Sequence, residues 1–247
     1  MKKFWDFKSK KYPRPFDEKI FKETKNVISI IESMGVNFSD KDIIDIGCGT
    51  GIYGLVLAEK AKSVLCLDFS TEMIDVAKSE IKNKNIKNAY CVISDFSDFN
   101  ERDYEKKFDI AIASMTPAIK TEKDILKMEA LSKKWCVYIG WAGKRENKIF
   151  DEVCSLLGIK PYIPKGFMEV KKNLDYRKIK YQSKIFETSW EWKGNIEEAV
   201  EEFYHRIILD KKEIDKEIIK NLLFKKFPDG NVKTETFASE GIIVWSV

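Results

Sequence analysis

The sequence predicts an α/β fold: a doubly wound, mostly parallel sheet of seven strands, with helical additions at the N-terminus and in the C-terminal third. Two observations favour this fold. Apolar runs alternate with amphipathic helical patterns along residues 42–158, and most of these runs are continuous, without intervening polar residues. Continuous apolar strands are typical of parallel sheets covered by helices on both faces. Right-handed crossovers would then place the first three strands in one half of the sheet.

The expected strands and helices follow one another along the chain. A helix is expected over 17–34, beginning after Asp17 and ending at Gly35. Ser70 and Thr121 are suited to cap two further helices, because their hydroxyls can accept hydrogen bonds from free backbone N–H groups. The expected strands are 42–46, 63–68, 89–95, 108–114, 135–141, 178–192 and 235–247, and the other helices are 52–61, 71–81, 122–131, 147–158, 195–209 and 211–226.

The composition is that of a folded protein. Hydrophobic residues make up 44% of the 247, which is enough for a substantial core. The 44 basic and 40 acidic residues give a net charge of +4, which does not by itself indicate a nucleic-acid partner. The N-terminus lacks the apolar segment of a signal peptide, and no apolar run is long enough to span a bilayer. We therefore expect a soluble, cytoplasmic protein without a membrane partner.

The cysteines favour a reducing environment. Their number is odd and no two form a C-x-x-C pair. The five are Cys48, Cys66, Cys91, Cys136 and Cys154. Three lie in apolar runs that are typical of strands, so we expect small buried side chains and no disulfide or metal site.

The regular alternation of strands and helices ends after Gly158. Two helices with polar faces are then expected between the last two strands. No internal repeat or low-complexity linker divides the chain, so we expect one domain over 1–247. Within it we distinguish an N-terminal arm and helix at 1–36, a core at 41–141 and an elaborated segment at 159–234.

The stretch IIDIGCGTGIYG, residues 43–54, places a glycine turn between a strand and a helix. One pattern begins at Gly49 and fits G-x-G-x-x-G, which cradles a dinucleotide pyrophosphate. The other begins at Gly47, two residues after Asp45, and fits G-x-G-x-G. Ligands of doubly wound sheets bind outside the carboxyl ends of the strands, near the point where strand order reverses. The turn is therefore the candidate ligand site.

Charge favours S-adenosylmethionine over NAD at this turn. A pyrophosphate brings two negative charges that Asp45 would repel, whereas the sulfonium and ammonium of S-adenosylmethionine are positive. Gly54, in this interpretation, lets the first helix pack close on the sheet. Asp68 ends the second strand about 20 residues past the glycines, where an acid can bind both ribose hydroxyls in either class of protein. Asp95 can accept a hydrogen bond from an adenine amino group, and Phe96 can pack on the ring.

The segments DIGCGTG, LCLDFSTEMI, ISDF and FDIAIA resemble, in order and spacing, the motifs of the class I, Rossmann-like S-adenosylmethionine-dependent methyltransferases. The resemblance covers residues 41–141. Helix–sheet packing is the alternative role for two of the aligned residues, Phe69 and Met73. The resemblance implies that Asp45, Gly47, Gly49 and Gly51 surround the methionine part, Asp68 binds ribose, Phe69 and Met73 flank adenine, Asp95 and Phe96 hold its edge, and Ser114 closes the cofactor side.

Methyl transfer from a sulfonium is an in-line displacement in which the leaving thioether needs no proton. The enzyme mainly has to align the groups and exclude water. An acid–base residue is needed only if the acceptor must lose a proton early. His205, the only histidine, and Tyr12 are the candidates for such a catalytic role. A surface position for His205 and a solvated terminus around Tyr12 are the alternative interpretations.

The segment S-M-T-P-A, 114–118, follows the fourth strand, where the acceptor approaches in the family. Relatives that methylate amines of DNA or glutamine carry Asn or Asp, two prolines and an aromatic residue there, and this chain does not. The cysteine pair of cytosine-carbon methylation is missing too. For Thr116 and Pro117 a simple turn is the alternative role. We therefore expect a methyltransferase with a small-molecule acceptor, enclosed by the arm at 1–14 and the elaborated segment.

Two other functions stay open. One is an RNA methyltransferase that uses KSKKYPR, residues 8–14, as a phosphate-binding arm; RNA binding would then depend on salt. The other is a non-catalytic S-adenosylmethionine-binding protein, which product formation would exclude. The sequence indicates neither the acceptor atom nor the oligomeric state.

Overall fold

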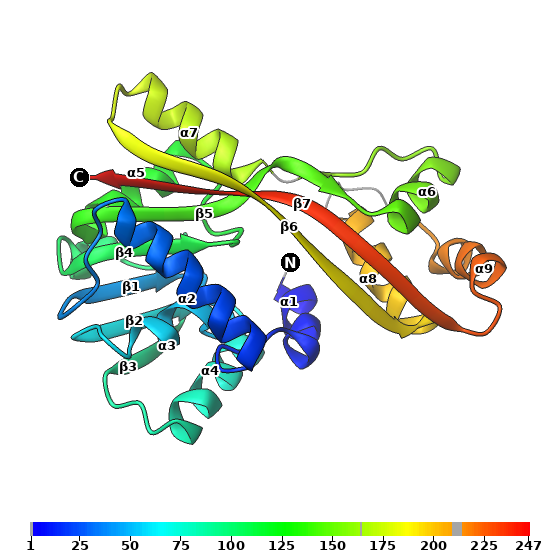
Figure 1. The fold of residues 1–247 in the computed structure, drawn as a ribbon, viewed down its shortest axis with the longest axis horizontal. Coiled ribbons are helices and arrows are strands. Elements are labelled where there is room, and N and C mark those ends of the chain that lie inside the picture. Colours follow the sequence, from blue (N-terminus) through cyan, green and yellow to red (C-terminus); the bar gives the residue numbers. More distant parts are fainter. Residues whose placement is uncertain (1, 164, 209–213) are drawn as a thin grey trace. The chain divides into compact units, whose positions relative to one another are not determined.

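The computed structural model describes residues 2–163, 165–208 and 214–247 (Figure 1). The chain forms two compact units. The first comprises Met1–Gly140, Gly166–Lys184 and Gly241–Val247, and the second comprises Trp141–Lys165 and Ile185–Glu240. The second unit overlaps the expected elaborated segment, but it begins at the end of the fifth strand and leaves out residues 166–184.

The strands form a seven-stranded sheet in the order β3-β2-β1-β4-β5-β7-β6. The pairs β1–β2, β1–β4, β2–β3 and β4–β5 are parallel, and β7 runs in the opposite direction (Figure 1). The doubly wound, mostly parallel fold is thereby confirmed. The strands are β1 (Asp42–Ile46), β2 (Ser63–Asp68), β3 (Ala89–Ile93), β4 (Phe108–Ser114), β5 (Ser132–Glu146), β6 (Tyr181–Asn195) and β7 (Asn231–Ser246).

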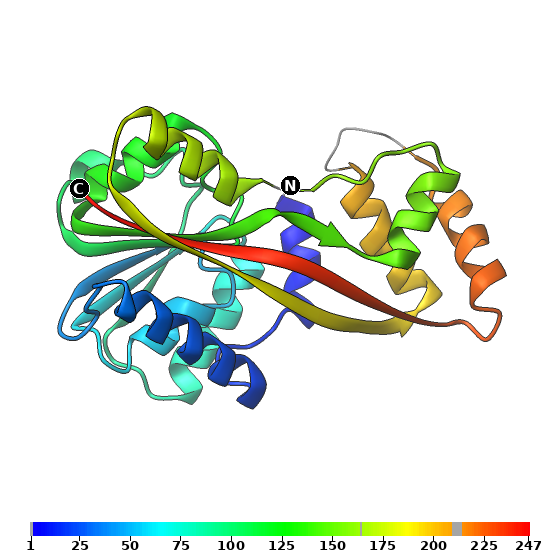
Figure 2. The same cartoon turned by 45° about the horizontal axis from the view of Figure 1, so that its top comes forward.

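Helices cover both faces of the sheet in the first unit. Figure 2 shows α2, in dark blue, on one side of the sheet and α7, in yellow-green, on the other. On the α2 side, α3 contacts β1 and β2, and α4 contacts β2 and β3, whereas α5 packs against β4 and α7. These helices are α1 (Lys2–Lys8), α2 (Glu18–Ser33), α3 (Ile52–Leu57), α4 (Thr71–Asn83), α5 (Glu122–Leu131) and α7 (Gly166–Tyr176).

Two helix starts form as the sequence predicts. The Ser70 hydroxyl accepts a hydrogen bond from the backbone N–H of Met73 and so caps α4. Thr121 caps α5 in a reciprocal arrangement, in which the Asp124 carboxylate accepts from the backbone N–H of Thr121. Each cap satisfies N–H groups that the first turn of a helix leaves without partners.

Three segments of the first unit meet at one carboxylate. Glu129, on α5, accepts two hydrogen bonds from the Arg177 guanidinium, at 3.0 and 2.7 Å. The indole N–H of Trp245, on β7, donates to the same carboxylate at 2.9 Å. Trp245 is 1% exposed. The network therefore joins residues far apart in the sequence around a buried aromatic side chain.

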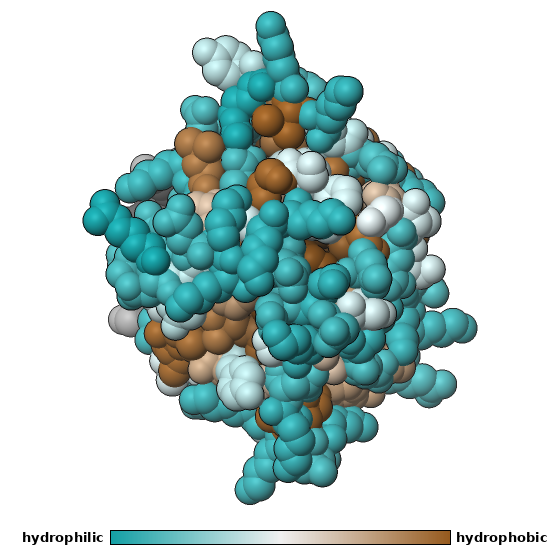
Figure 3. Space-filling view, turned by 90° about the vertical axis from the view of Figure 1, so that its left-hand side faces the viewer, coloured by the Kyte–Doolittle hydropathy of each residue, from teal (hydrophilic) through white to brown (hydrophobic). Residues whose placement is uncertain are grey.

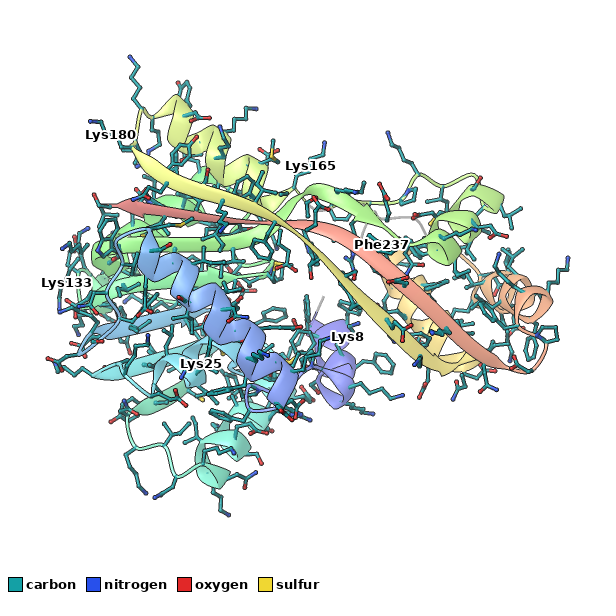
Figure 4. The ribbon with its side chains drawn as sticks, in the orientation of Figure 1. Lys8, Lys25, Lys133, Lys165, Lys180 and Phe237 are labelled. Carbon is teal, nitrogen blue, oxygen red and sulfur yellow. The ribbon has the colours of Figure 1, made fainter. Side chains whose placement is uncertain are left out.

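The second unit packs three helices on one face of its strands. They are α6 (Lys148–Leu156), α8 (Ile196–Ile208) and α9 (Lys216–Lys226). Phe150 and Phe203 meet edge to face in its core, with ring centroids 5.2 Å apart. The opposite face is exposed and includes Phe237, which is labelled in Figure 4. Residues 209 and 211–213 of the expected helices lie outside the described residues.

The structure also contains elements that the sequence analysis did not predict. Strand β5 extends to Glu146, beyond its apolar centre, and α1 forms in the charged N-terminus. Helix α7 buries Phe167, Val170 and Leu174, which follow helical spacing and could have been recognised.

The molecular face in Figure 3 is mainly hydrophilic, with small, separate apolar patches. Within the described part of the chain, every helix is too short or too polar to cross a bilayer.

Candidate functional site

A cavity of about 90 Å³ lies in the first unit, at the glycine turn between β1 and α3. Its walls come from the ends of β1, β2 and β4, the start of α4 and the N-terminal arm. The lining residues are Trp5, Tyr12, Asp45, Gly47, Cys48, Gly49, Ile52, Tyr53, Asp68, Phe69, Met73, Ser114, Met115, Thr116 and Pro117. The structure thus brings seven of the expected cofactor-binding residues, and Tyr12, around one space.

The three glycines of the turn have different roles. All have positive φ angles, of 68° at Gly47, 56° at Gly49 and 86° at Gly51, which side chains rarely adopt. A Cβ at Gly47 would lie 1.9 Å from the Thr116 hydroxyl oxygen, so the fold itself needs this glycine. A Cβ at Gly51 would lie 2.6 Å from Leu55, and Gly51 does not line the cavity.

Gly49 is the glycine that faces the ligand space. The nearest atoms to a Cβ there would be Tyr12 Cε1 at 3.8 Å and Met73 Sδ at 3.9 Å, both from cavity-lining residues. A side chain at Gly49 would therefore enter the cavity. The backbone at this position is left open to approach by a ligand.

Gly54 packs the first helix against the sheet, as expected. A Cβ there would lie 2.8 Å from the Cys66 sulfur and 2.9 Å from an Asp45 carboxylate oxygen. The pyrophosphate pattern that needs Gly54 beside a ligand has no counterpart in the cavity lining, because Gly54 is buried in helix–sheet packing.

Asp45 is a buried carboxylate beneath the turn. It is 1% exposed, and its Oδ2 accepts a hydrogen bond from the backbone N–H of Gly54 at 2.8 Å. Burial raises the pKa of Asp45 to about 7; the negative charge of Asp68 adds to the rise, and the Gly54 hydrogen bond opposes it. A cation at the cavity would favour the ionised form.

Asp68 connects β2 to both the glycine turn and α4. Its Oδ2 accepts from the backbone N–H of Gly49 at 2.9 Å, and its Oδ1 accepts from that of Ser70 at 2.8 Å. Burial raises the pKa of Asp68, although these backbone hydrogen bonds oppose the shift. Each carboxylate oxygen keeps a second lone pair, so the group can accept further hydrogen bonds from a ligand.

The remaining expected cofactor residues divide into two sets. Phe69, Met73 and Ser114 line the cavity. Asp95 and Phe96 do not line it in this structure. Asp95 is exposed and its Oδ1 accepts from the backbone N–H and the hydroxyl of Ser97, while Phe96 is buried with the Lys127 ammonium 5.1 Å from its ring centroid. Their adenine-binding role stays a prediction.

The end of β4 contributes residues that had no assigned ligand role. Met115 has a positive φ of 50°, an uncommon conformation for a residue with a side chain, and its N–H donates to the carbonyl of Ile139. The Thr116 hydroxyl accepts a hydrogen bond from the backbone N–H of Ala118 at 3.1 Å. This bond belongs to the simple turn that the sequence offered as an alternative role for Thr116 and Pro117. Met115, Thr116 and Pro117 nevertheless line the cavity.

The N-terminal arm is fixed to the glycine turn and to α4. The Thr50 hydroxyl donates to the carbonyl of Pro13 at 2.7 Å, and the Ser70 hydroxyl donates to Asp6 Oδ1 at 2.6 Å. Trp5 and Tyr12 meet edge to face, with centroids 6.1 Å apart, and both line the cavity. Tyr12 was expected near the cofactor from the sequence, whereas Trp5 was not, because only the fold of α1 brings Trp5 to this place.

His205 belongs to the second unit. It lies on α8, where its side chain is 18% exposed and its Nε2 is 3.5 Å from Glu201 Oε2. The ring of Tyr204 meets it edge to face. The described residues of both units contain no group of three or more His, Cys, Asp or Glu side chains placed to hold a metal ion.

Comparison with known proteins defines the class. A family model described as a methyltransferase domain matches residues 37–221. The ribosomal RNA small subunit methyltransferase A of Mesomycoplasma hyopneumoniae is 29% identical over 201 residues, which cover 80% of this chain and 71% of that protein.

Solved structures share the fold. The magnesium protoporphyrin IX methyltransferase of Synechocystis with bound SAH has a TM-score of 0.52 and 19% identity, covering 68% of this chain and 75% of that one. The precorrin 8w decarboxylase of Methanobacterium thermoautotrophicum has a TM-score of 0.51 and 12% identity, covering 90% of each chain.

The fold and the family model define a class I, Rossmann-like methyltransferase. The chain belongs to the methyltransferase-domain family, and it is an enzyme whose cofactor is S-adenosylmethionine. The residues of the cavity fit this cofactor. Two carboxylates, Asp45 and Asp68, suit its cationic and hydroxyl groups, and Gly49 leaves space at the turn.

Proposed function

We propose that the protein transfers the methyl group of S-adenosylmethionine in line to a small-molecule acceptor. The observation that carries the proposal is the cavity at the glycine turn, which Trp5 and Tyr12 of the N-terminal arm help to line. An arm that closes over the bound cofactor would exclude water and limit the size of what can approach. Relatives that methylate amines of DNA or glutamine carry Asn or Asp, two prolines and an aromatic residue after the fourth strand, and residues 114–118 lack this motif.

We assign the binding roles residue by residue. Asp68 would accept hydrogen bonds from the ribose hydroxyls. Asp45, in its ionised form, would attract the sulfonium and ammonium groups of the cofactor. Phe69 and Met73 would contact the adenine, and Ser114 would close the cavity at the end of β4. Bound S-adenosylmethionine supplies an electrophilic methyl group, and alignment of the acceptor then provides much of the rate.

The size of the cavity implies movement of the arm. It encloses about 90 Å³, whereas ordinary ligand pockets measure about 300–1,000 Å³. Side-chain hydrogen bonds join the arm to the start of α4. Near its start, Lys2 Nζ donates to the Thr71 hydroxyl at 3.1 Å, an exposed hydrogen bond, and Asp6 accepts from Ser70. We infer that the arm opens to admit the cofactor and closes before transfer.

An RNA acceptor is the second candidate, because the Mesomycoplasma relative is named as a ribosomal RNA methyltransferase. The arm could contribute phosphate contacts through Lys10 and Lys11, which are exposed, and through Lys8 on α1, labelled in Figure 4. Small-molecule methylation is the proposal we retain, since the net charge of +4 is modest for an RNA-binding surface. We also propose a cytoplasmic location, in keeping with five free cysteines.

The decisive experiment supplies methyl-labelled S-adenosylmethionine with two acceptor pools. One pool is a small-molecule extract of cells, and the other is purified ribosomal RNA. We expect label in a low-mass product and none in RNA. A Gly49→Val protein is the matched negative control, because its turn would obstruct the cofactor. Label that enters RNA, or no label in either pool, would contradict the small-molecule proposal.

A further inference from the structure

Helix α5 places a buried lysine against the loop that follows β3. The Lys127 side chain is 8% exposed, and its ammonium nitrogen lies 3.3 Å from a carboxylate oxygen of Glu101. The same ammonium donates a hydrogen bond to the backbone carbonyl of Ser97 at 3.1 Å, and it lies 5.1 Å from the ring centroid of Phe96. One side chain of α5 therefore holds several residues of the loop at 96–101.

Packing of α5 does not need a charge at this position. Met128 and Leu131, on the same helix, are buried apolar residues. A buried ammonium loses hydration, and its ion pairs are often no more stabilising than well-packed apolar side chains. Within the described part of the chain, the polar contacts of Lys127 all go to this one loop. Its charge therefore serves the shape of the loop more than the stability of the helix.

The loop that Lys127 holds also fixes Asp95. Asp95 Oδ1 accepts hydrogen bonds from the backbone N–H of Ser97 at 2.9 Å and from the Ser97 hydroxyl at 2.8 Å. Among the described residues, no hydrogen bond is formed to Asp95 Oδ2, so this oxygen can accept one from a ligand. The backbone N–H of Ser97 lowers the pKa of Asp95, partial burial opposes the shift, and the charge of Lys127 contributes to the lowering. Asp95 is therefore an ionised acceptor at neutral pH.

The loop begins beside the residue proposed to bind the ribose. The backbone N–H of Ser94 donates to the carbonyl of Asp68 at 3.0 Å, and Asp68 lines the cavity. The base of S-adenosylmethionine is bonded to its ribose, and the cavity of about 90 Å³ is too small for the whole cofactor. The start of this loop is therefore where the base is expected to extend.

We propose that Lys127 is a positioning residue for recognition of the adenine base, because it holds the loop in which Asp95 can accept a hydrogen bond from the exocyclic amino group. The inference rests on the adenine role proposed for Asp95, and it is independent of the methyl acceptor. Lys127 is not among the residues that line the cavity, and it acts through the Ser97 carbonyl. Loss of its ammonium would release that carbonyl and loosen the turn that fixes Asp95.

Calorimetric titration tests the proposal with two ligands that need no methyl acceptor. One is S-adenosylhomocysteine, the demethylated product, and the other is its analogue in which hydrogen replaces the amino group of the base. The parent should bind the first about tenfold more tightly, because the second lacks a hydrogen bond to a charged group. Lys127→Met should bring this affinity ratio close to one, by weakening the binding of S-adenosylhomocysteine and leaving that of the analogue nearly unchanged.

A double-mutant cycle separates positioning from a general structural role. Asp95→Ala should also bring the affinity ratio close to one, and Lys127→Met added to it should change the ratio no further. A loss of stability alone would weaken both ligands equally and leave the ratio as it is in the parent. Lys123→Met is the matched control, because it removes an exposed lysine one turn earlier on α5, and it should keep the ratio of the parent.

Lys127→Met should fold, as circular dichroism can verify. Its unbranched side chain of similar length suits a buried position on a helix, and Glu101, which is 42% exposed, can be hydrated once its partner is lost. The ratio in the parent needs no variant, so the proposal can be refuted even if this variant does not fold.

Three outcomes would overturn the proposal. A ratio close to one in the parent would show that the amino group of the base is not recognised. A ratio that survives Asp95→Ala would contradict the adenine role of Asp95 and this inference with it. A ratio that Asp95→Ala abolishes and a folded Lys127→Met retains would contradict the role of Lys127 alone. The acceptor is tested separately, since label in RNA would contradict the small-molecule proposal and leave this ratio unaffected.

Discussion

The carboxylate of Asp68 accepts a hydrogen bond from the backbone N–H of Gly49 at 2.9 Å, so the end of β2 fixes the geometry of the glycine turn. The residue proposed to bind the ribose thus also holds the loop proposed to approach the methionine part. Its second oxygen, bonded to the N–H of Ser70, adds the start of α4 to the same arrangement.

Asp68→Ala should weaken S-adenosylmethionine binding by about 1–3 kcal/mol, because hydrogen-bonding groups of the ligand and of the turn lose their partner. Calorimetry with the cofactor and its demethylated product measures the change. Asp75→Ala, an exposed acid on the same helix as Ser70, is the control and should bind normally. Equal affinities for the two variants, or tight NAD binding by the parent, would contradict the assignment.

Two glycines of the turn should respond differently to substitution. Gly49→Val should abolish cofactor binding and leave a folded protein, because its side chain enters the cavity. Gly47→Ala should instead lower the Tm, since its Cβ would meet Thr116 Oγ1 at 1.9 Å. Circular dichroism and calorimetry on both variants distinguish these effects. Unchanged affinity in Gly49→Val would show that the turn is not the site.

The raised pKa of Asp45 predicts a pH dependence of both stability and binding. Its value rises from 3.8 to about 7 on folding, so the folded protein without ligand retains a proton that the unfolded chain releases. This contribution to stability is complete below pH 3.8 and is lost as pH rises to about 7. Asp45→Asn should flatten that decline in a series of unfolding curves.

Cofactor affinity should change with pH in the opposite sense. If the ionised Asp45 attracts the cationic cofactor, affinity should rise as pH increases towards 7 and then level off, by at most about tenfold per pH unit. Asp45→Asn should lose this dependence. An affinity that is independent of pH in the parent would show that the ionisation of Asp45 is not coupled to cofactor binding.

Removal of residues 1–14 should reduce turnover far more than cofactor affinity. The truncated chain keeps the sheet and α2, and it loses Trp5 and Tyr12, which line the cavity. Cofactor association should become faster, as measured by stopped-flow fluorescence, because no arm has to open. Full activity of the truncated chain, or RNA binding that salt and truncation both abolish, would refute the proposed lid.

His205→Gln should leave the rate nearly unchanged. The imidazole is half-buried on α8 beside Glu201, a setting that packing alone accounts for. A general base for a hydroxyl acceptor would instead cost about a hundredfold or more on removal. Steady-state kinetics with the acceptor from the labelling experiment decides between the two roles.

Local sequence patterns were sufficient to predict much of the fold and about half of the residues that line the cavity. Strands 42–46, 63–68 and 108–114 form as predicted, because continuous apolar runs between glycines and polar turns allow few alternatives. Asp45 and Asp68 meet at the cavity because parallel strands end at the same edge of a sheet. These relationships follow from the order of the elements.

Contacts between distant segments were less predictable. Trp5 reaches the cavity only because α1 docks on α4, through Asp6 and Ser70, and no pattern within α1 indicates that partner. Glu129 and Trp245 are hydrogen-bonded although they are 116 positions apart, on α5 and β7. Sequence periodicity can indicate on which face of its helix or strand a side chain lies, but it cannot indicate which two faces pack together.

The Glu129–Trp245 hydrogen bond has a consequence for synthesis on the ribosome. Proteins commonly fold domain by domain from the N-terminus as the chain emerges. Here residues 241–247 belong to the first unit, and Trp245 is buried within it. The nascent chain must therefore hold an incomplete cofactor-binding unit, lacking the inner part of β7, while all of residues 141–240 are translated. The apolar surface that Trp245 later covers lacks this partner throughout that interval, and the first unit becomes complete only after the second has been made.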